Sequence, residues 1–164
     1  MKHNFHYVPI LSSLKALLSH KQILENFLKE SNECFPTNIR SFKDSECYKS
    51  NIFFKTNQNS NQIILYIDDF ETSNPLGDCR KKQELCGVYY RIRNLHQKYK
   101  SKSRFTQLAL IVKTDYLKKF GYGTVLEPLI RDLKKLENEG INVPNANGQL
   151  INFKGTISFL VSDN

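Results

Sequence analysis

The apolar positions from residue 61 to the C-terminus follow two periods, which predict four strands and one helix. Short apolar runs bounded by turn residues are typical of strands, whereas apolar positions three and four residues apart are typical of a helix. The predicted elements are strands at about 62–68, 85–92, 107–113 and 155–161, and a helix from near Thr124 to before Gly140. A hairpin-like turn is expected at Asn147-Gly148. The order strand, strand, strand, helix, strand indicates an α/β domain.

The first 60 residues have a different character. Apolar residues recur at helical spacing between residues 9 and 30, with a break near Ser19, and predict two short helices. Residues 31–60 are polar and rich in loop-forming residues, apart from one short element at about 51–55. We therefore divide the chain into a helical and loop appendage at 1–60 and an α/β core at 61–164.

The composition fits one folded domain that works inside the cell. The chain has 164 residues, of which 40% are hydrophobic and 12% aromatic, enough to build a core. It contains no apolar stretch of about 20 residues that could span a membrane, and no apolar block typical of a signal peptide. The four cysteines lack the close spacing of zinc ligands and are expected to be reduced thiols. These features predict a nuclear or cytoplasmic protein.

Two of the predicted strands end in carboxylates. The first strand runs into Asp68 and Asp69, and the last strand is followed by Asp163. Because an isolated buried charge is costly, carboxylates at the ends of buried strands indicate a divalent cation, and Mg²⁺ or Mn²⁺ suits oxygen ligands. Successive side chains of a strand point to opposite faces, so only one of Asp68 and Asp69 is expected to reach the metal.

A basic stretch separates the second and third predicted strands. Residues 91–104 contain no acidic residue, and their basic side chains are Arg91, Arg93, Lys98, Lys100, Lys102 and Arg104. The chain has a formal net charge of +8, which favours an anionic partner. Basic side chains interleaved with Tyr99 and short hydroxyls suit a phosphate backbone, so we predict that this stretch binds DNA without reading its sequence. A solvated hairpin is the alternative.

Several segments, taken in order, resemble a known family. The order of elements is similar to the opening topology of ribonuclease H-like domains. The stretch from Leu65-Tyr66-Ile67-Asp68-Asp69-Phe70 through Asn74-Pro75-Leu76-Gly77 resembles the "DGF…NP.G" region of eukaryotic cut-and-paste transposases of the CACTA-like and related superfamilies. Further similar segments follow in the same order at 90–95, 107–110, 126–136, 140–141 and 155–164. Residues 7–18 resemble the segment that precedes this core in transposon-derived animal proteins.

The resemblance implies a chemistry and roles for the aspartates. In ribonuclease H-like domains the first and fourth strands lie side by side and bring one Asp each to a shared metal site. Asp68 matches the first catalytic aspartate, because the relatives often have Gly in place of Asp69, and Asp163 matches the second metal ligand. Asp69 stays the alternative to Asp68. The implied reaction is cleavage and strand transfer at DNA phosphodiesters, assisted by two divalent ions.

The chain departs from the family in one respect. Such transposases need a third acidic residue, from a helix beyond the fourth strand, whereas this sequence ends at Asn164. We therefore expect an incomplete ribonuclease H-like fold and a transposase fragment that is inactive alone. A homo-oligomer is expected only of a full-length protein. The alternatives are a non-enzymatic module that binds nucleic acid or protein, an interaction domain whose acids are turn residues, and a relic that does not fold.

Overall fold

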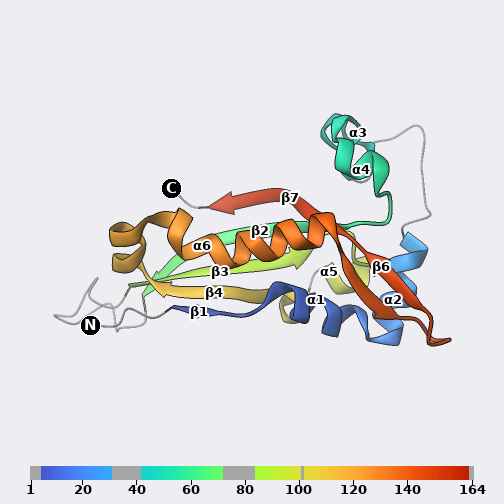
Figure 1. The fold of residues 1–164 in the computed structure, drawn as a ribbon, viewed down its shortest axis with the longest axis horizontal. Coiled ribbons are helices and arrows are strands. Elements are labelled where there is room, and N and C mark those ends of the chain that lie inside the picture. Colours follow the sequence, from blue (N-terminus) through green and yellow to red (C-terminus); the bar gives the residue numbers. More distant parts are fainter. Residues whose placement is uncertain (1–4, 31–41, 72–83, 101, 163–164) are drawn as a thin grey trace.

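The computed structural model describes residues 5–30, 42–71, 84–100 and 102–162, which form two sheets and the helices around them (Figure 1). The strands are β1 (His6–Tyr7), β2 (Asn61–Glu71), β3 (Glu84–Ile92), β4 (Gln107–Lys113), β5 (Ile141–Pro144), β6 (Leu150–Phe153) and β7 (Gly155–Ser162). The larger sheet has the order β1-β4-β3-β2-β7. In it β2, β3 and β4 are antiparallel neighbours, whereas β7 lies parallel to β2. The chain is therefore α/β, as predicted.

The four predicted strands of the core are confirmed, with small differences at their ends. Their alternation separates two faces of the sheet. On β2, Ile63 and Leu65 are buried while Tyr66 is half-buried, and on β3 Val88 and Tyr90 are buried. One face of the sheet therefore belongs to the main core, and the other is more open to solvent.

The two predicted N-terminal helices are also confirmed, on either side of Ser19. The helical elements are α1 (Ile10–Leu18), α2 (Lys21–Glu30), η1 (Phe42–Asp44), α3 (Glu46–Ser50), α4 (Ile52–Thr56), α5 (Gln97–Lys100), η2 (Ser103–Phe105) and α6 (Thr114–Asn138). The Ser19 hydroxyl donates a hydrogen bond to the carbonyl of Lys15 at 2.7 Å and so satisfies a carbonyl in the last turn of α1. The short element predicted at 51–55 corresponds to α4, whereas η1 and α3 form within residues that were predicted to be loop, where the Ser45 hydroxyl caps α3 by accepting from the backbone N–H of Tyr48.

Helix α6 consists of two helical parts joined at a kink; the second corresponds to the helix predicted from near Thr124, and the first, which begins at Thr114, was not predicted. Its first part is interrupted at Gly121, whose φ of 78° and ψ of 156° are not helical. Leu117 in this first part is buried, and its burial stabilises the packing of the segment against the core. The predicted C-terminal end is correct, because the helix closes before Gly140, which adopts a φ of 76°.

Helices α1 and α6 pack together over the core face of the sheet (Figure 1). The buried side chains on these helices are Ile10, Leu14, Leu18, Leu117, Val125, Leu129, Leu133 and Leu136. The strand β1 extends the sheet beside β4. Tyr7 on β1 donates a hydrogen bond to the carboxylate of Asp132 on α6 at 2.6 Å. The boundary at residue 60 stays a prediction, but β1 and α1 share the sheet and core of the residues that follow it.

The predicted hairpin-like turn is confirmed as the connection between β5 and β6. Gly148 in this turn has a φ of 77°, and Asn145 donates its backbone N–H to the carbonyl of Gln149 at 2.8 Å. Phe153 on β6 packs edge-on against Phe27 of α2, with ring centroids 5.6 Å apart. The hairpin thereby joins α2 to the main core.

The opposite face of the large sheet is covered at one end by an aromatic cluster. Phe42 packs against Phe54 of α4 and against Phe159 of β7, with ring centroids 5.7 Å and 5.2 Å away. The guanidinium of Arg93 lies 4.5 Å from the Phe42 ring and 4.6 Å from the Phe159 ring. This cluster leaves the middle of the face accessible, which is where a pocket lies.

Candidate functional site

The two adjacent aspartates at the C-terminal part of β2 have different surroundings. Asp68 pairs across the strands with Gly87, and Asp69 pairs with Cys86. Asp68 lines the pocket on the open face of the sheet. Asp69 instead accepts a hydrogen bond from the Cys86 thiol, and Cys86 belongs to the main core. The predicted alternation of the pair is therefore confirmed, and only Asp68 faces the pocket.

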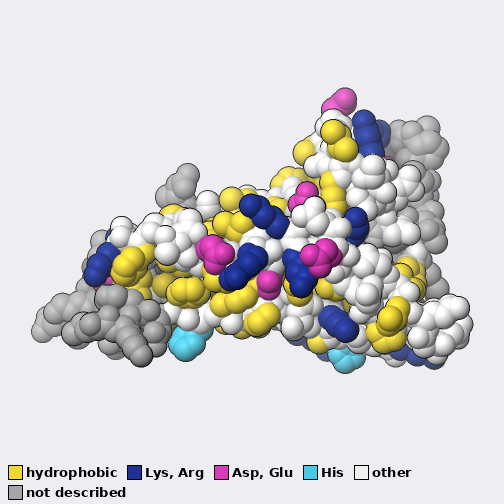
Figure 2. Space-filling model, in the orientation of Figure 1, with side chains coloured by type: hydrophobic (Ala, Val, Ile, Leu, Met, Phe, Trp, Pro, Cys, Tyr) yellow, Lys and Arg dark blue, Asp and Glu magenta, His cyan; other side chains and the backbone are white. Residues whose placement is uncertain are grey.

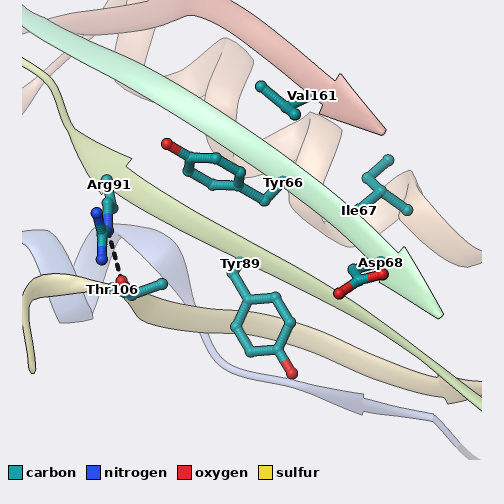
Figure 3. A pocket seen from close by; sticks show the side chains of 7 residues that line it. All are labelled: Tyr66, Ile67, Asp68, Tyr89, Arg91, Thr106 and Val161. Carbon is teal, nitrogen blue, oxygen red and sulfur yellow. Dashed lines mark hydrogen bonds between the residues drawn. The ribbon is translucent and has the colours of Figure 1, made fainter. Parts of the chain in front are cut away.

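The pocket has a volume of about 390 Å³ and extends along the open face over β2, β3 and the start of β4 (Figure 3). Figure 3 shows Asp68 near one end and Arg91 near the other, with the two tyrosines between them. Its lining residues are Tyr66, Ile67, Asp68, Tyr89, Arg91, Thr106 and Val161. The pocket thus combines aromatic walls with one acidic and one basic group.

A glycine shapes the acidic end of this pocket. A Cβ atom on Gly87, which lies opposite Asp68, would approach the Cε2 atom of Tyr89 to 2.6 Å. The missing side chain therefore lets the Tyr89 ring lie over the strand beside the aspartate. Because Tyr66 is the direct cross-strand partner of Tyr89, the two aromatic residues flank the same part of the sheet.

At the basic end, Arg91 is held by two oxygen atoms. Its Nε donates to the Thr106 hydroxyl at 2.5 Å, and its Nη1 approaches the carbonyl of Lys100 at 3.5 Å. A guanidinium has five N–H donors in a fixed plane, so these two contacts orient the group without using all of its donors. Arg91 is therefore positioned to meet an anionic group in the pocket.

The other residues of the predicted DNA-binding stretch lie beyond that end. Lys98, Lys100, Lys102 and Arg104 are exposed on α5, on η2 and in the residue before η2. The turn that leads to them is fixed by Asn94, which donates to the carbonyl of Ser60 and accepts from the backbone N–H of Gln62, both at 2.9 Å. Arg93 differs, because it lies between two rings and burial lowers its pKa.

The basic stretch and Asp68 are separated along the sheet. Arg91 pairs with Ile64, four residues before Asp68 on β2, which corresponds to roughly 13 Å at the rise of a β-strand. The pocket spans this interval, so it is the feature that brings Asp68 and Arg91 into one site. The remaining basic residues stand at its far end and extend away from it.

The face that carries α6 has mixed charges. Figure 2 shows Lys and Arg side chains interspersed with Asp and Glu over this helix. Arg131 pairs with Glu127 at 3.3 Å, and Lys135 pairs with Glu139 at 3.9 Å. Alternating signs of this kind are typical of a solvated helix surface. The stretch 91–104 is thus the better location for contacts with an anion.

Strand β7 runs beside β2 with a bulge that sets its register. Ile63 pairs with Ile157, but the next residue, Ile64, pairs with Phe159, and the extra residue Ser158 donates its hydroxyl to the carbonyl of Ile63 at 2.9 Å. The register ends with Ile67 opposite Ser162. These two residues directly precede Asp68 and Asp163 in the sequence. Asp163 itself lies outside the described residues.

Asp68 suits a hard cation such as Mg²⁺, because its carboxylate is exposed and its oxygen atoms can coordinate the ion directly. Within the described ranges no group of three or more His, Cys, Asp or Glu side chains is arranged to hold a metal ion. A second carboxylate would have to come from a residue such as Asp163. The metal site therefore stays a prediction.

Comparison with known proteins gives no family for this chain. No protein-family model matches it, and a search of curated proteins finds no significant match. Among the described helices, none combines the length and the apolar character needed to cross a membrane. Function must therefore be argued from the site itself.

Sequence reasoning did not assign Tyr66, Tyr89 or Thr106 to a site. A signal was available for the tyrosines, since each occupies a position that alternates with buried residues of its strand and so points to the open face. Their cross-strand pairing, and the contact between Thr106 and Arg91, depend on the register of the sheet.

Proposed function

We propose that the chain is part of a ribonuclease H-like domain of transposase origin, whose ancestral reaction is metal-dependent cleavage and strand transfer at DNA phosphodiesters. The observation that carries the proposal is the parallel register of β2 and β7, in which Ile67 lies opposite Ser162. Each of these residues is followed directly by an aspartate, Asp68 or Asp163. Parallel strands end at the same edge of a sheet, so the register supports a shared carboxylate site.

The proposed roles follow from chemistry. Asp68 and Asp163 would hold Mg²⁺ or Mn²⁺, with water and phosphate oxygens completing the coordination. The metal would supply stabilisation of the negative charge that develops on phosphate oxygens. Arg91 and the lysines of the basic stretch would hold the DNA backbone, which gives affinity that falls with salt and little sequence preference.

The first test is metal binding by the whole chain and by two matched variants. Asp68→Asn and Asp69→Asn each remove one carboxylate from adjacent positions, on opposite faces of the sheet. We expect Asp68→Asn to weaken Mn²⁺ binding by about ten-fold or more, because a neutral amide is a poorer ligand than a carboxylate, and Asp69→Asn to bind as the unchanged protein does. Isothermal titration calorimetry measures both, with thermal denaturation in the presence of metal as a second readout.

Each other outcome of this test has a defined meaning. A loss confined to Asp69→Asn would assign the metal to the alternative aspartate on the core face. Equal Mn²⁺ affinity in all three proteins, or no measurable affinity in the unchanged chain, would contradict a role for either aspartate. Either result would reject the proposed metal-dependent reaction.

A second candidate function is a non-enzymatic module of the same fold that binds nucleic acid. The observation that favours it is the pocket itself, whose tyrosines and oriented Arg91 provide ligand-binding chemistry without a metal. Asp68→Asn separates the two candidates. A binding module should hold DNA equally well or more tightly after this change, because a negative charge beside the phosphate is removed.

A further inference from the structure

The pocket on the open face offers two aromatic surfaces that the proposed phosphodiester chemistry does not use. Tyr66 and Tyr89 lie directly opposite each other on β2 and β3 and line the same hollow. In Figure 3 their rings point away from each other, Tyr66 toward the side of Arg91 and Tyr89 away from it. The volume of about 390 Å³ lies within the range of small-ligand sites.

We infer that this pocket binds an unpaired nucleotide, with its base stacked on Tyr66 or Tyr89 and its phosphate at Arg91. The inference rests on the proposed function in one respect, that the ligand is nucleic acid. Aromatic side chains on a sheet surface stack bases of any sequence, because every base has a π-face. A tyrosine adds a hydroxyl that can bond a base edge while its ring stacks.

The charges around the pocket favour this occupant. Arg91 is oriented by Thr106, and an arginine held in this way is suited to phosphate because of its planar donors. The exposed cations Lys98, Lys102 and Arg104 belong to the stretch whose Lys100 carbonyl lies 3.5 Å from the Arg91 Nη1, so this stretch passes the basic end of the pocket, although Arg104 itself lines a separate hollow with Lys21. A nucleotide bound at Arg91 can therefore extend its backbone onto the basic stretch. A purely apolar ligand would offer no hydrogen-bond acceptor to the guanidinium of Arg91.

The pocket also places the base in relation to Asp68. The aspartate lines the end of the hollow opposite Arg91, so a strand that crosses the pocket runs from the basic stretch toward the carboxylate. A base inside a duplex is stacked on its neighbours and cannot reach the tyrosines unless it is extruded. The site should therefore select single-stranded or frayed DNA next to the phosphate that meets Asp68.

The test compares two single strands of equal length and charge, one with bases and one abasic, in a fluorescence anisotropy assay with the whole chain. We expect the strand with bases to bind about ten-fold more tightly, in line with the usual effect of base–aromatic stacking. The double change Tyr66→Leu and Tyr89→Leu should remove this preference and leave the abasic strand unaffected. The double change to Phe, which retains the rings, should keep it.

A matched control is Tyr122→Leu, which removes an exposed tyrosine from α6, outside the pocket. It should leave the preference intact. If the double leucine variant does not fold, the unchanged protein still decides the question through a strand that carries 2-aminopurine. Stacking on a tyrosine should quench the fluorescence of that base, and unchanged fluorescence on binding would overturn the inference.

Failure of the inference can be told apart from failure of the proposed function. Equal affinity of the unchanged protein for both strands, falling with salt, would reject the base pocket and leave DNA binding through the backbone in place. Absence of binding to both strands and to duplex DNA, or binding that does not respond to salt, would reject nucleic acid as the partner altogether.

Discussion

At the scale of single residues, the surroundings of a side chain decide its role more than its type does. Asp68 and Asp69 are neighbours in the chain, yet one lines an open pocket and the other accepts a hydrogen bond from a buried thiol. Arg91 and Arg93 show the same contrast, because the first meets the pocket and the second is enclosed by aromatic rings. Asp68 and Asp69 differ because they point to opposite faces of the sheet, whereas Arg91 and Arg93 differ in the neighbours that they meet on one face.

The enclosed position of Arg93 predicts a role in stability. Arg93→Ala removes the guanidinium between Phe42 and Phe159, and we expect the free energy of unfolding to fall by about 1 kcal/mol. Arg93→Lys should recover only part of this loss, since an ammonium lacks the planar surface that stacks on rings. Urea denaturation measures both variants.

The control is Arg131→Ala, which breaks the exposed ion pair with Glu127 on α6. Exposed pairs of this kind contribute roughly 0–1 kcal/mol, so this variant should lie close to the unchanged protein. Equal effects of Arg93→Ala and Arg131→Ala would contradict a specific contribution from the aromatic enclosure.

At the scale of elements, local backbone geometry shapes both the long helix and the pairing of strands. Gly121 interrupts α6 with a positive φ, which allows the segment from Thr114 to turn before the main helix begins. On β7 the bulge at Ser158 shifts the pairing by one residue and determines which residue of that strand lies opposite Ile67. Insertion or deletion of one residue in either place would change the direction of every side chain that follows in that element.

The kink in α6 can be tested with two glycines that lie close together. Gly121→Ala places a Cβ on a backbone conformation that is nearly restricted to glycine, so we expect a loss of about 1–3 kcal/mol in the free energy of unfolding. Gly123→Ala should instead stabilise by up to about 1 kcal/mol, because it lies in helical backbone. No heavy atom lies within 4 Å of a Cβ built at either position, so crowding does not enter the comparison.

Chemical denaturation of the two variants gives opposite signs if the kink belongs to the folded protein in solution. Stabilisation by both substitutions would mean that α6 is continuous through residue 121. The pair is matched in chemistry and in accessibility, and only the backbone conformation differs.

At the scale of the whole molecule, buried ionisable groups couple the fold to pH. Burial and a hydrogen bond to Asp69 raise the pKa of Cys86 from 9.0 to about 12, and burial raises the pKa of Tyr90 from 10.0 to about 12. Burial and the hydrogen bond to Asp132 also raise the pKa of Tyr7. The folded protein therefore holds these three protons to a higher pH than the unfolded chain does.

The sign of the pH dependence follows from these shifts. The unfolded chain releases the protons first, so the stability contribution is complete below about pH 9 and is lost as the pH rises toward about 12. We expect the melting temperature to fall steadily over this interval. Tyr90→Phe should make the fall shallower, because it removes one of the titrating groups.

A melting temperature that stays constant from neutral pH to about pH 11 in the unchanged protein would contradict the linkage.

The sequence by itself determined the kind and order of the four core strands, of the two N-terminal helices and of the main part of α6. Apolar runs such as the one that contains Ile63 and Leu65 predicted the strands, and the spacing of leucines before Gly140 predicted the end of α6, because burial and local propensity leave a period in the chain. The alternation of Asp68 and Asp69 followed from strand geometry alone. The short helical part from Thr114 to the kink at Gly121 was not predicted, since a segment of this length shows no clear period.

Only the tertiary structure decided which side chains share the pocket. Tyr66, Tyr89 and Thr106 come from three strands or their ends, and their contacts depend on the register of β2, β3 and β4. The bulge at Ser158 likewise sets the alignment of β7, although no period in the sequence marks it. Register arises from many weak contacts summed across strands, and pairs distant in sequence leave no local pattern from which it could be read.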